Sequence, residues 1–175
     1  MVIPDDKKDK LLIHAVDSIE GQPDMVPETM VALSNANLVQ LNQFMLSLLD
    51  SGSSDTLINK RALPQGVVPM KDHTKQFVTT QGTYESNEYI EVDKFYLPEF
   101  SKAQFFKNVK IYLFDSKETT YDIIVGRNIL MTGGFCLDFS EKHTKWMDKA
   151  VPFKKLWIPQ ESYSDDDLPV GGTVP

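Results

Sequence analysis

The sequence contains few of the residues that build metal centres and disulfide scaffolds. Its 175 residues include one cysteine, Cys136, and three histidines, His14, His73 and His143, which lie far apart along the chain. One cysteine cannot form a disulfide within the chain, and these histidines lack metal-ligand spacing. The sequence therefore predicts no metal and no cofactor. With no disulfide pattern and no signal peptide, it also predicts a reducing, cytoplasmic location.

Basic residues and long apolar runs are also scarce. Acidic side chains outnumber basic ones by 25 to 18 and the net charge is −7, which argues against a basic surface for duplex nucleic acid. Contact with single strands through a local patch stays open, although no cluster of Lys or Arg indicates one. No apolar run approaches the ~20 residues that span a bilayer, so no membrane partner is expected. Hydrophobic residues make up 41% of the chain, which excludes a wholly disordered protein and allows one domain with tails.

Among the features that are present, one stretch is unusual. The largely apolar run 44–49 leads directly into Asp50, and Ser51, Gly52 and Ser53 follow. This order predicts a buried strand that ends in a tight turn with a carboxylate on it. Burying a carboxylate is costly unless it is hydrogen-bonded, so we expect donors close to it. The alternative is an ordinary strand that ends in an Asx or Ser turn.

A second stretch, residues 121–130, also has an apolar strand that ends at a glycine, Gly126, and continues into a short helix. Together, the segments LLDSG (48–52) and IIVGRNIL (123–130) resemble the paired signatures of the retropepsins, the aspartic proteases of retroviruses and of LTR retrotransposons such as the gypsy type. This family has an Asp-Thr/Ser-Gly turn and, roughly seventy residues later, two apolar residues, Gly, Arg, Asn or Asp, and Leu. The resemblance covers about residues 28–150.

The resemblance implies an all-β fold, the closed barrel of the retropepsin-like acid proteases with one short C-terminal helix, catalytic as a homodimer. The protease domain is expected at residues 28–150, between an N-terminal linker (1–27) and a disordered C-terminal linker (151–175) that is rich in Pro, Gly and Asp. Truncation after Ala150 is therefore expected to cost little stability. Local patterns predict strands at 30–33, 39–49, 56–58, 75–80, 84–92, 95–100, 109–114 and 135–139, a short edge at 145–147, and a helical turn at 59–63.

Peptide hydrolysis in this family uses two carboxylates about 3 Å apart that share one proton. Asp50 is the only Asp in the chain that is followed by Ser or Thr and then Gly. The second carboxylate therefore has to come from a second copy, in which the same residue lies across a two-fold axis. The resemblance implies an aspartic endopeptidase that cleaves a retroelement Gag-Pol polyprotein, with Asp50 as the catalytic residue. Such an enzyme would act in the cytoplasm or within virus-like particles.

The resemblance also assigns roles to the residues of two turns. Ser51, Gly52 and Ser53 complete the active-site turn, where the Ser51 hydroxyl bonds across the two-fold axis and the Gly52 backbone faces the substrate. A glycine between two β-rich stretches is a hairpin signal. The stretch Thr80, Gln81 and Gly82 has this pattern and lies where the family carries the flap that closes over substrate. A plain surface hairpin is the alternative.

Two further positions match the second signature. Gly126 corresponds to the glycine that lets the second strand pack against the catalytic turn. Arg127 corresponds to an arginine that pairs with an acid four residues after the catalytic Asp. That position holds Ser54 in this chain, and the nearest acid, Asp55, is one residue further. The acid partner of Arg127 is therefore left open.

The sequence lacks the motifs of other enzyme classes. A serine hydrolase needs Gly-x-Ser-x-Gly, and no phosphate-binding glycine-rich loop with a lysine is present. Three functions are left open: an endopeptidase that processes its own polyprotein, a host retropepsin-like domain similar to those of ubiquitin-linked shuttle factors, and a non-catalytic dimeric interaction module with the same fold. The expected partners are a second copy and, for the first two functions, a polypeptide.

Overall fold

The computed structural model describes residues 24–35 and 43–156. This part of the chain contains one α-helix, α2 (Arg127–Gly133), and one 3₁₀ turn, η1 (Lys60–Ala62). Its strands are β1 (Met25–Val26), β2 (Glu28–Ser34), β3 (Met45–Leu49), β4 (Leu57–Asn59), β5 (Met70–Thr79), β6 (Gly82–Tyr96), β7 (Phe105–Phe114), β8 (Ile123–Val125), β9 (Cys136–Asp138), β10 (His143–Trp146), β11 (Lys149–Pro152) and β12 (Lys154–Lys155). The sequence prediction of a mainly β-protein with one short helix is confirmed for these residues.

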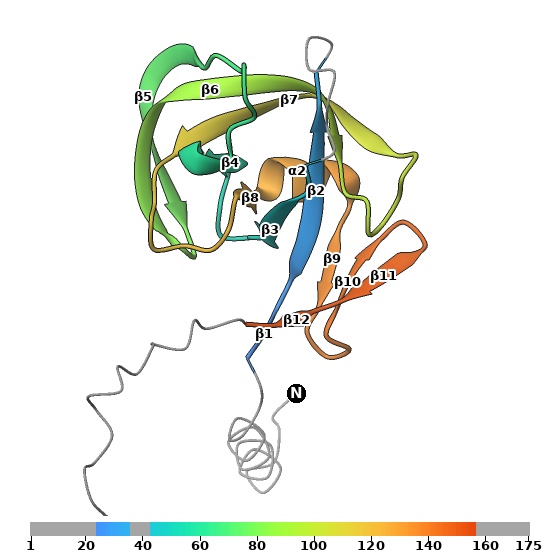
Figure 1. Ribbon diagram of the computed structural model, residues 1–175. Helices are drawn as coiled ribbons and strands as arrows, with labels where there is room; N and C mark the ends of the chain where they lie inside the picture. Colours follow the sequence, from blue (N-terminus) through green and yellow to red (C-terminus); the bar gives the residue numbers. More distant parts are fainter. Residues whose placement is uncertain (1–23, 36–42, 157–175) are drawn as a thin grey trace, which may run out of the picture.

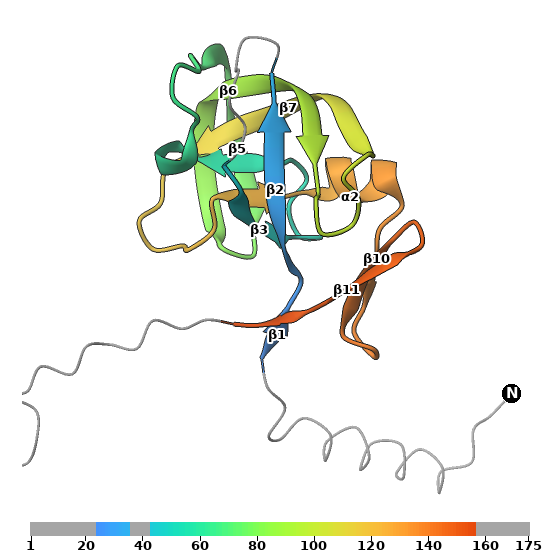
Figure 2. The same cartoon turned by 45° about the vertical axis from the view of Figure 1, so that its right-hand side comes forward.

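Seven strands form the main sheet, in the order β2-β3-β8-β4-β7-β6-β5. The strand β6 also pairs with β2, so the pairings return to the strand at which they began. The resulting curvature of the sheet is visible in Figures 1 and 2. Within it, β3 runs parallel to β8 with Leu49 opposite Val125. Both strands therefore end at the same edge, and the residues that follow them, Asp50 and Gly126, are brought together.

The core explains why these segments are strands. In β2 the side chains alternate between half-buried and buried, and Val31 and Leu33 point inward, which is the pattern of a strand with one covered face. All three residues of β4 and of β8 are buried, because these central strands are covered on both sides. Burial on both faces accounts for the apolar residues of β8 and for Leu57 and Ile58 in β4. The buried ends of β3 and β8 therefore support the turn that carries Asp50.

Some element boundaries differ from the sequence prediction, and others agree with it. The strand expected at 39–49 begins at Met45 among the described residues, and 36–42 lie outside them. The strand β6 contains the whole strand expected at 84–92 but only the first two residues of the one expected at 95–100. Residues 97–100 form a turn instead, where Pro98 has no backbone N–H to donate to a strand pairing. The expected helical turn at 59–63 is confirmed as η1, which ends before Pro64.

The last strands lie outside the main sheet. The strands β11, β10 and β9 form a three-stranded sheet, and β12 pairs with β1 near the start of the described chain. The expected linker boundary at Ala150 falls inside β11, and the expected boundary at residue 27 falls after β1. The reason is that Val151 and Phe153, at 6% and 4% exposure, have apolar side chains that pack into the fold. In residues 24–35 and 43–156, no helix is long and apolar enough to cross a membrane.

Candidate active site

Asp50 lies directly after β3, on a turn that is closed by its own backbone. The Asp50 amide donates to the carbonyl of Val125 over 2.9 Å, and its carbonyl accepts from the Ser53 amide over 3.1 Å. The Gly52 amide donates to Asp50 Oδ1 over 2.8 Å. A Cβ at Gly52 would lie 3.0 Å from this Oδ1, so the absence of a side chain permits the tight turn. The carboxylate is 2% exposed.

The second oxygen of this carboxylate is bound by the tip of the β5–β6 hairpin. The backbone amide of Thr80 donates to Asp50 Oδ2 over 2.8 Å, and the Thr80 hydroxyl donates to the same oxygen over 2.9 Å. Thr80 and Gln81 are the two residues between β5 and β6, and Gly82 follows with a φ of 134°, a conformation that favours glycine. The structure thus places the predicted flap tip directly on the predicted catalytic residue. From the sequence, the hydroxyl residues on both sides of Gly52 are expected to donate to Asp50, but the structure gives this role to the Gly52 amide and to Thr80. The Ser53 hydroxyl donates to the Asp55 carbonyl instead.

Side chains around the tip hold it in this position. The Thr119 hydroxyl donates to Gln81 Oε1 over 3.2 Å, and the Tyr84 hydroxyl donates to the Gln81 carbonyl over 2.9 Å. Thr119 is held in turn by Arg61, whose guanidinium donates to the Thr119 carbonyl over 2.8 Å. The ring of Tyr84 packs on Phe114, with 4.7 Å between the ring centroids. Sequence reasoning missed Thr119 and Tyr84, since they are remote from the tip in the chain or belong to a strand pattern.

Gly126 meets the turn after β3 at very short range. A Cβ placed on Gly126 would lie 2.2 Å from the carbonyl oxygen of Asp55, a distance that no side chain can occupy. Its amide donates to the Thr56 hydroxyl over 3.1 Å, and Thr56 donates to the side chain of Asn128 over 2.8 Å. Thr56 is fully buried, yet its position in the apolar strand pattern gave no sign of this bridging role.

Arg127 binds the catalytic turn through a backbone group. Its guanidinium donates to the Ser51 carbonyl over 2.8 Å, and its amide donates to the Ser53 carbonyl over 2.8 Å. The nearest acid in sequence, Asp55, pairs instead with Lys75 over 3.0 Å. The turn is therefore fastened to the first residue of α2 without an acid of the catalytic segment.

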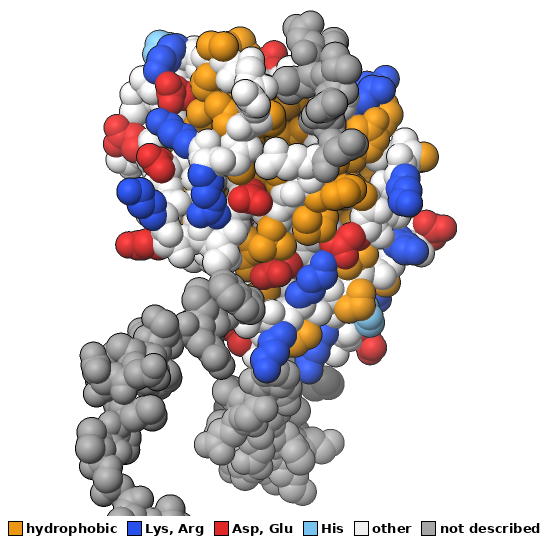
Figure 3. Space-filling view, viewed as in Figure 1, with side chains coloured by type: hydrophobic (Ala, Val, Ile, Leu, Met, Phe, Trp, Pro, Cys, Tyr) orange, Lys and Arg blue, Asp and Glu red, His pale blue; other side chains and the backbone are white. Residues whose placement is uncertain are grey.

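A cavity of about 360 Å³ opens beside Asp50. Its polar part is made by the two turns, including Ser51 and Gln81. Its apolar part includes Leu48, Leu137 and Phe139. The face drawn in Figure 3 carries hydrophobic side chains interspersed with acidic ones. The cavity therefore combines an apolar lining with a few polar groups, which is typical of a binding site.

Tyr121 borders the same cavity, and its phenol acts as a hydrogen-bond donor that keeps its proton. Burial, together with the hydrogen bond that its hydroxyl donates to Glu28, raises the pKa of Tyr121 well above its usual value. The phenol therefore stays protonated at neutral pH. It fastens the start of β2 to the segment before β8.

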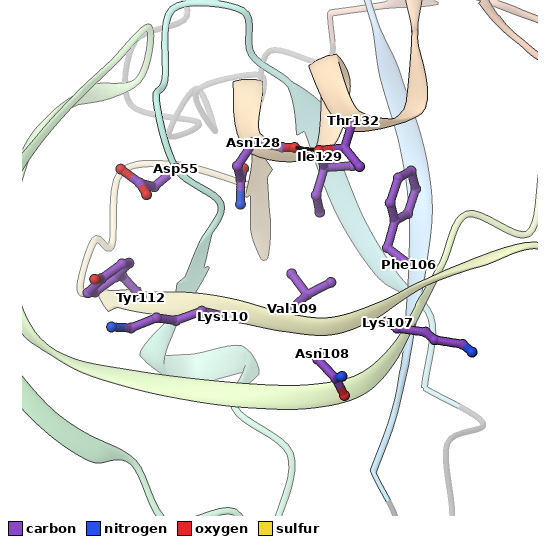
Figure 4. Close-up of a pocket in the computed structure, with 10 residues that line it drawn as sticks. All are labelled: Asp55, Phe106, Lys107, Asn108, Val109, Lys110, Tyr112, Asn128, Ile129 and Thr132. Carbon is purple, nitrogen blue, oxygen red and sulfur yellow. Dashed lines mark hydrogen bonds between the residues drawn. The ribbon is translucent and has the colours of Figure 1, made fainter.

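A second cavity, of about 300 Å³, lies between β7 and α2 (Figure 4). Two of its three charged side chains are paired, since Lys110 pairs with Asp72 over 2.6 Å and Asp55 pairs with Lys75. The hydrogen bond from Lys110 and the one from the His73 amide lower the pKa of Asp72 to about 2. These exposed pairs are typical of a solvated surface. In residues 24–35 and 43–156, no group of three or more His, Cys, Asp and Glu side chains is placed to hold a metal ion.

No family model and no curated protein matches the chain. Among solved structures, it is similar to the retroviral protease-like domain of Ddi1 from Leishmania major, with 15% identity, 76% of this chain and 96% of that chain covered, and a TM-score of 0.47. It is also similar to a retropepsin-like aspartic protease from Rickettsia conorii, with 18% identity, 68% and 90% coverage, and a TM-score of 0.36. A protein of unknown function from Legionella pneumophila has 14% identity, 60% and 84% coverage, and a TM-score of 0.36. All three are distant likenesses.

Proposed function

We propose that this chain is a retropepsin-like aspartic endopeptidase in which Asp50 acts together with Asp50 of a second copy. The observation that carries the proposal is the setting of Asp50. This carboxylate is 2% exposed, lies at the common edge of β3 and β8, and borders a cavity. The return of the strand pairings to β2 supports the closed barrel that the sequence resemblance implies.

The reaction requires two carboxyl groups with one proton between them. The ionised member takes a proton from a water molecule, whose oxygen then forms a bond to the scissile carbonyl carbon. The neutral member gives its proton to the carbonyl oxygen. The resulting tetrahedral species breaks its C–N bond as a proton passes to the leaving amine. Since the chain has one Asp-Ser-Gly turn, a homodimer supplies the second carboxyl group.

Each predicted site residue has a place in this proposal. Ser51, Gly52 and Ser53 form the turn that fixes the carboxylate, and Thr80, Gln81 and Gly82 form the tip of the flap. Gly126 packs closely on the Asp55 carbonyl, and Arg127 binds the Ser51 and Ser53 carbonyls, so both support the turn. The proposed substrate is a polyprotein that includes this chain, with cleavage in the cytoplasm and without a cofactor.

The test is titration of the purified full chain with a statine-type inhibitor, combined with cleavage of polyprotein segments that flank the chain. We expect one inhibitor to bind per two chains, and specific activity to rise with protein concentration because a monomer holds half a site. Constant specific activity of a sedimentation-verified monomer would contradict the dimeric site. A chain that neither binds the inhibitor nor cuts any peptide is a non-catalytic module. Cleavage of other polypeptides but not of the flanking segments favours a host protein.

A further inference from the structure

Thr80, at the tip of the β5–β6 hairpin, holds Asp50 Oδ2 through two hydrogen bonds. An ionised carboxylate has about four lone-pair positions that accept hydrogen bonds. Three of those on Asp50 are filled from within the chain, one by the Gly52 amide and two by Thr80. One position is therefore left. The proposed reaction needs two, one for the proton shared with the second carboxyl group and one for the attacking water.

We propose that the Thr80 tip is an autoinhibitory cap, which has to lift from Asp50 before water and substrate can enter. This inference rests on the proposed function for its consequence, although the cap itself does not depend on peptidase activity. Both donors act on Oδ2. Release of Thr80 alone therefore restores two positions, while the Gly52 amide keeps the carboxylate oriented.

The geometry of the turn fits a cap that can open. The β5–β6 ladder ends at the pair Thr79 and Gly82, so the Thr80 amide takes no part in the ladder. The Gln81 amide is satisfied locally by the Thr79 hydroxyl over 3.0 Å. The hairpin can therefore leave Asp50 without breaking its own backbone pairing. Thr80 is exposed on its outer side, so its donors can turn to solvent.

Two residues outside the hairpin, Thr119 and Arg61, oppose this opening, and we call them the latch. The Thr119 hydroxyl holds the Gln81 side chain, and Arg61 holds the Thr119 carbonyl. Neither Thr119 nor Arg61 has a hydrogen bond to Asp50 among the described residues. Thr119 is therefore a positioning residue, which sets how readily the cap lifts and leaves the carboxylate unchanged.

Amide hydrogen exchange measured by NMR on the full chain tests the cap directly. We expect exchange at Thr80 to accelerate about 10- to 100-fold in Asp50→Ala, the factor that corresponds to a hydrogen bond to a charged group. The variant Asp50→Asn, which keeps one neutral acceptor, should lie in between. Protected amides in β8 verify the fold in both variants. Equal exchange at Thr80 in the wild type and in both variants overturns the cap.

The association rate of a statine-type inhibitor tests whether the cap and its latch act as a gate that controls access to Asp50. We expect Thr119→Val to raise this rate about fivefold, because one neutral hydrogen bond is lost from the latch. Thr119→Ser, which keeps the hydroxyl, should restore the wild-type rate. Thr83→Val is the matched control, since Thr83 is an exposed residue of the same hairpin. An unchanged rate in Thr119→Val overturns the gate, whereas an inhibitor that binds no variant overturns the proposed function and leaves the exchange result valid.

Discussion

Asp50 and Asp138 both follow or end a strand and both accept three hydrogen bonds, but the two carboxylates differ in where their donors come from. Asp138, at the end of β9, accepts from Ser140, from the Glu141 amide and from Lys145 at 2.7, 3.0 and 2.9 Å. All of these donors lie within seven residues of it, and one is a cation. Asp50 accepts from neutral donors only, and two of its three bonds come from a hairpin thirty residues away.

The comparison teaches that the number of hydrogen bonds does not separate a structural carboxylate from the one proposed to react. The two carboxylates differ in their burial and in how far along the chain their donors lie. The hydrogen bonds from Glu141, Ser140 and Lys145 lower the pKa of Asp138, so its charged form is stabilised by residues that lie close to it in the chain. At Asp50 two of the three hydrogen bonds come from a segment that belongs to another part of the sheet. A movement of that segment changes the site without unfolding the turn.

The largest expected effect separates the two turns by activity. Asp50→Asn should abolish peptide cleavage, because an amide neither shares the proton nor activates water. Asp138→Asn, the matched control, should leave cleavage near the wild-type level. Turnover of a peptide substrate by both folded variants is the measurement. Retained turnover in Asp50→Asn would remove the catalytic assignment.

Truncation tests how firmly the region of Asp138 belongs to the fold. The composition of the tail predicts a small cost for ending the chain at Ala150. The structure reverses this expectation, since the cut removes the buried side chains of Val151 and Phe153 and the pair between Lys154 and Glu99. We expect a loss of about 4 kcal/mol in the free energy of unfolding, mainly from the two apolar side chains. Denaturant unfolding of this variant, with truncation after Leu156 as its control, decides between the two expectations.

Gly126→Ala tests the support of the Asp50 turn. The new Cβ would lie 2.2 Å from the Asp55 carbonyl oxygen, so the backbone has to shift. We expect a loss of about 3 kcal/mol in stability, the upper part of the range for overpacking. Gly134→Ala is a useful control, because a Cβ there meets no atom within 4 Å, although its φ of 69° adds some strain. An equal loss in both variants would show that close packing at Gly126 is unimportant.

Gly82→Val acts on the hairpin that covers Asp50. The φ of 134° at Gly82 resists a β-branched residue, but the exposed position makes few core contacts. We expect a change of only about 1 kcal/mol in stability together with a strong fall in kcat/KM. Thermal unfolding and steady-state kinetics measure the two quantities. Equal kcat/KM in the variant and the wild type would make the tip a plain surface hairpin.

The smallest expected effect concerns the pH dependence of stability at Asp138. Its pKa is lower in the folded chain than in the unfolded chain, so its contribution is complete above about pH 4 and is lost as the pH falls toward the folded pKa. Between about pH 4 and pH 2, the wild type should therefore lose more stability than Asp138→Asn. Unfolding curves across this range check the sign. A steeper loss in the variant would contradict it.

The sequence by itself determined the local elements of the site. The apolar run before Asp50, the small residues after it and the glycine at Gly82 each encode a strand end or a turn among neighbouring residues. The segment around Gly126 likewise encodes a strand that continues into a helix. These features depend on backbone sterics and on short-range hydrogen bonds, which consecutive residues contain.

The tertiary structure alone decided which groups meet. The local sequence pattern does not predict that Thr80 donates to Asp50. It also does not predict the ion pair between Asp55 and Lys75 or the hydrogen bond from Arg127 to the Ser51 carbonyl. The burial of Val151 and Phe153 was not predicted for the same reason, because their apolar side chains pack on a surface that earlier strands build. Contacts between distant segments depend on how the sheet closes, and the free energy of burial that selects them is a property of the whole packed fold.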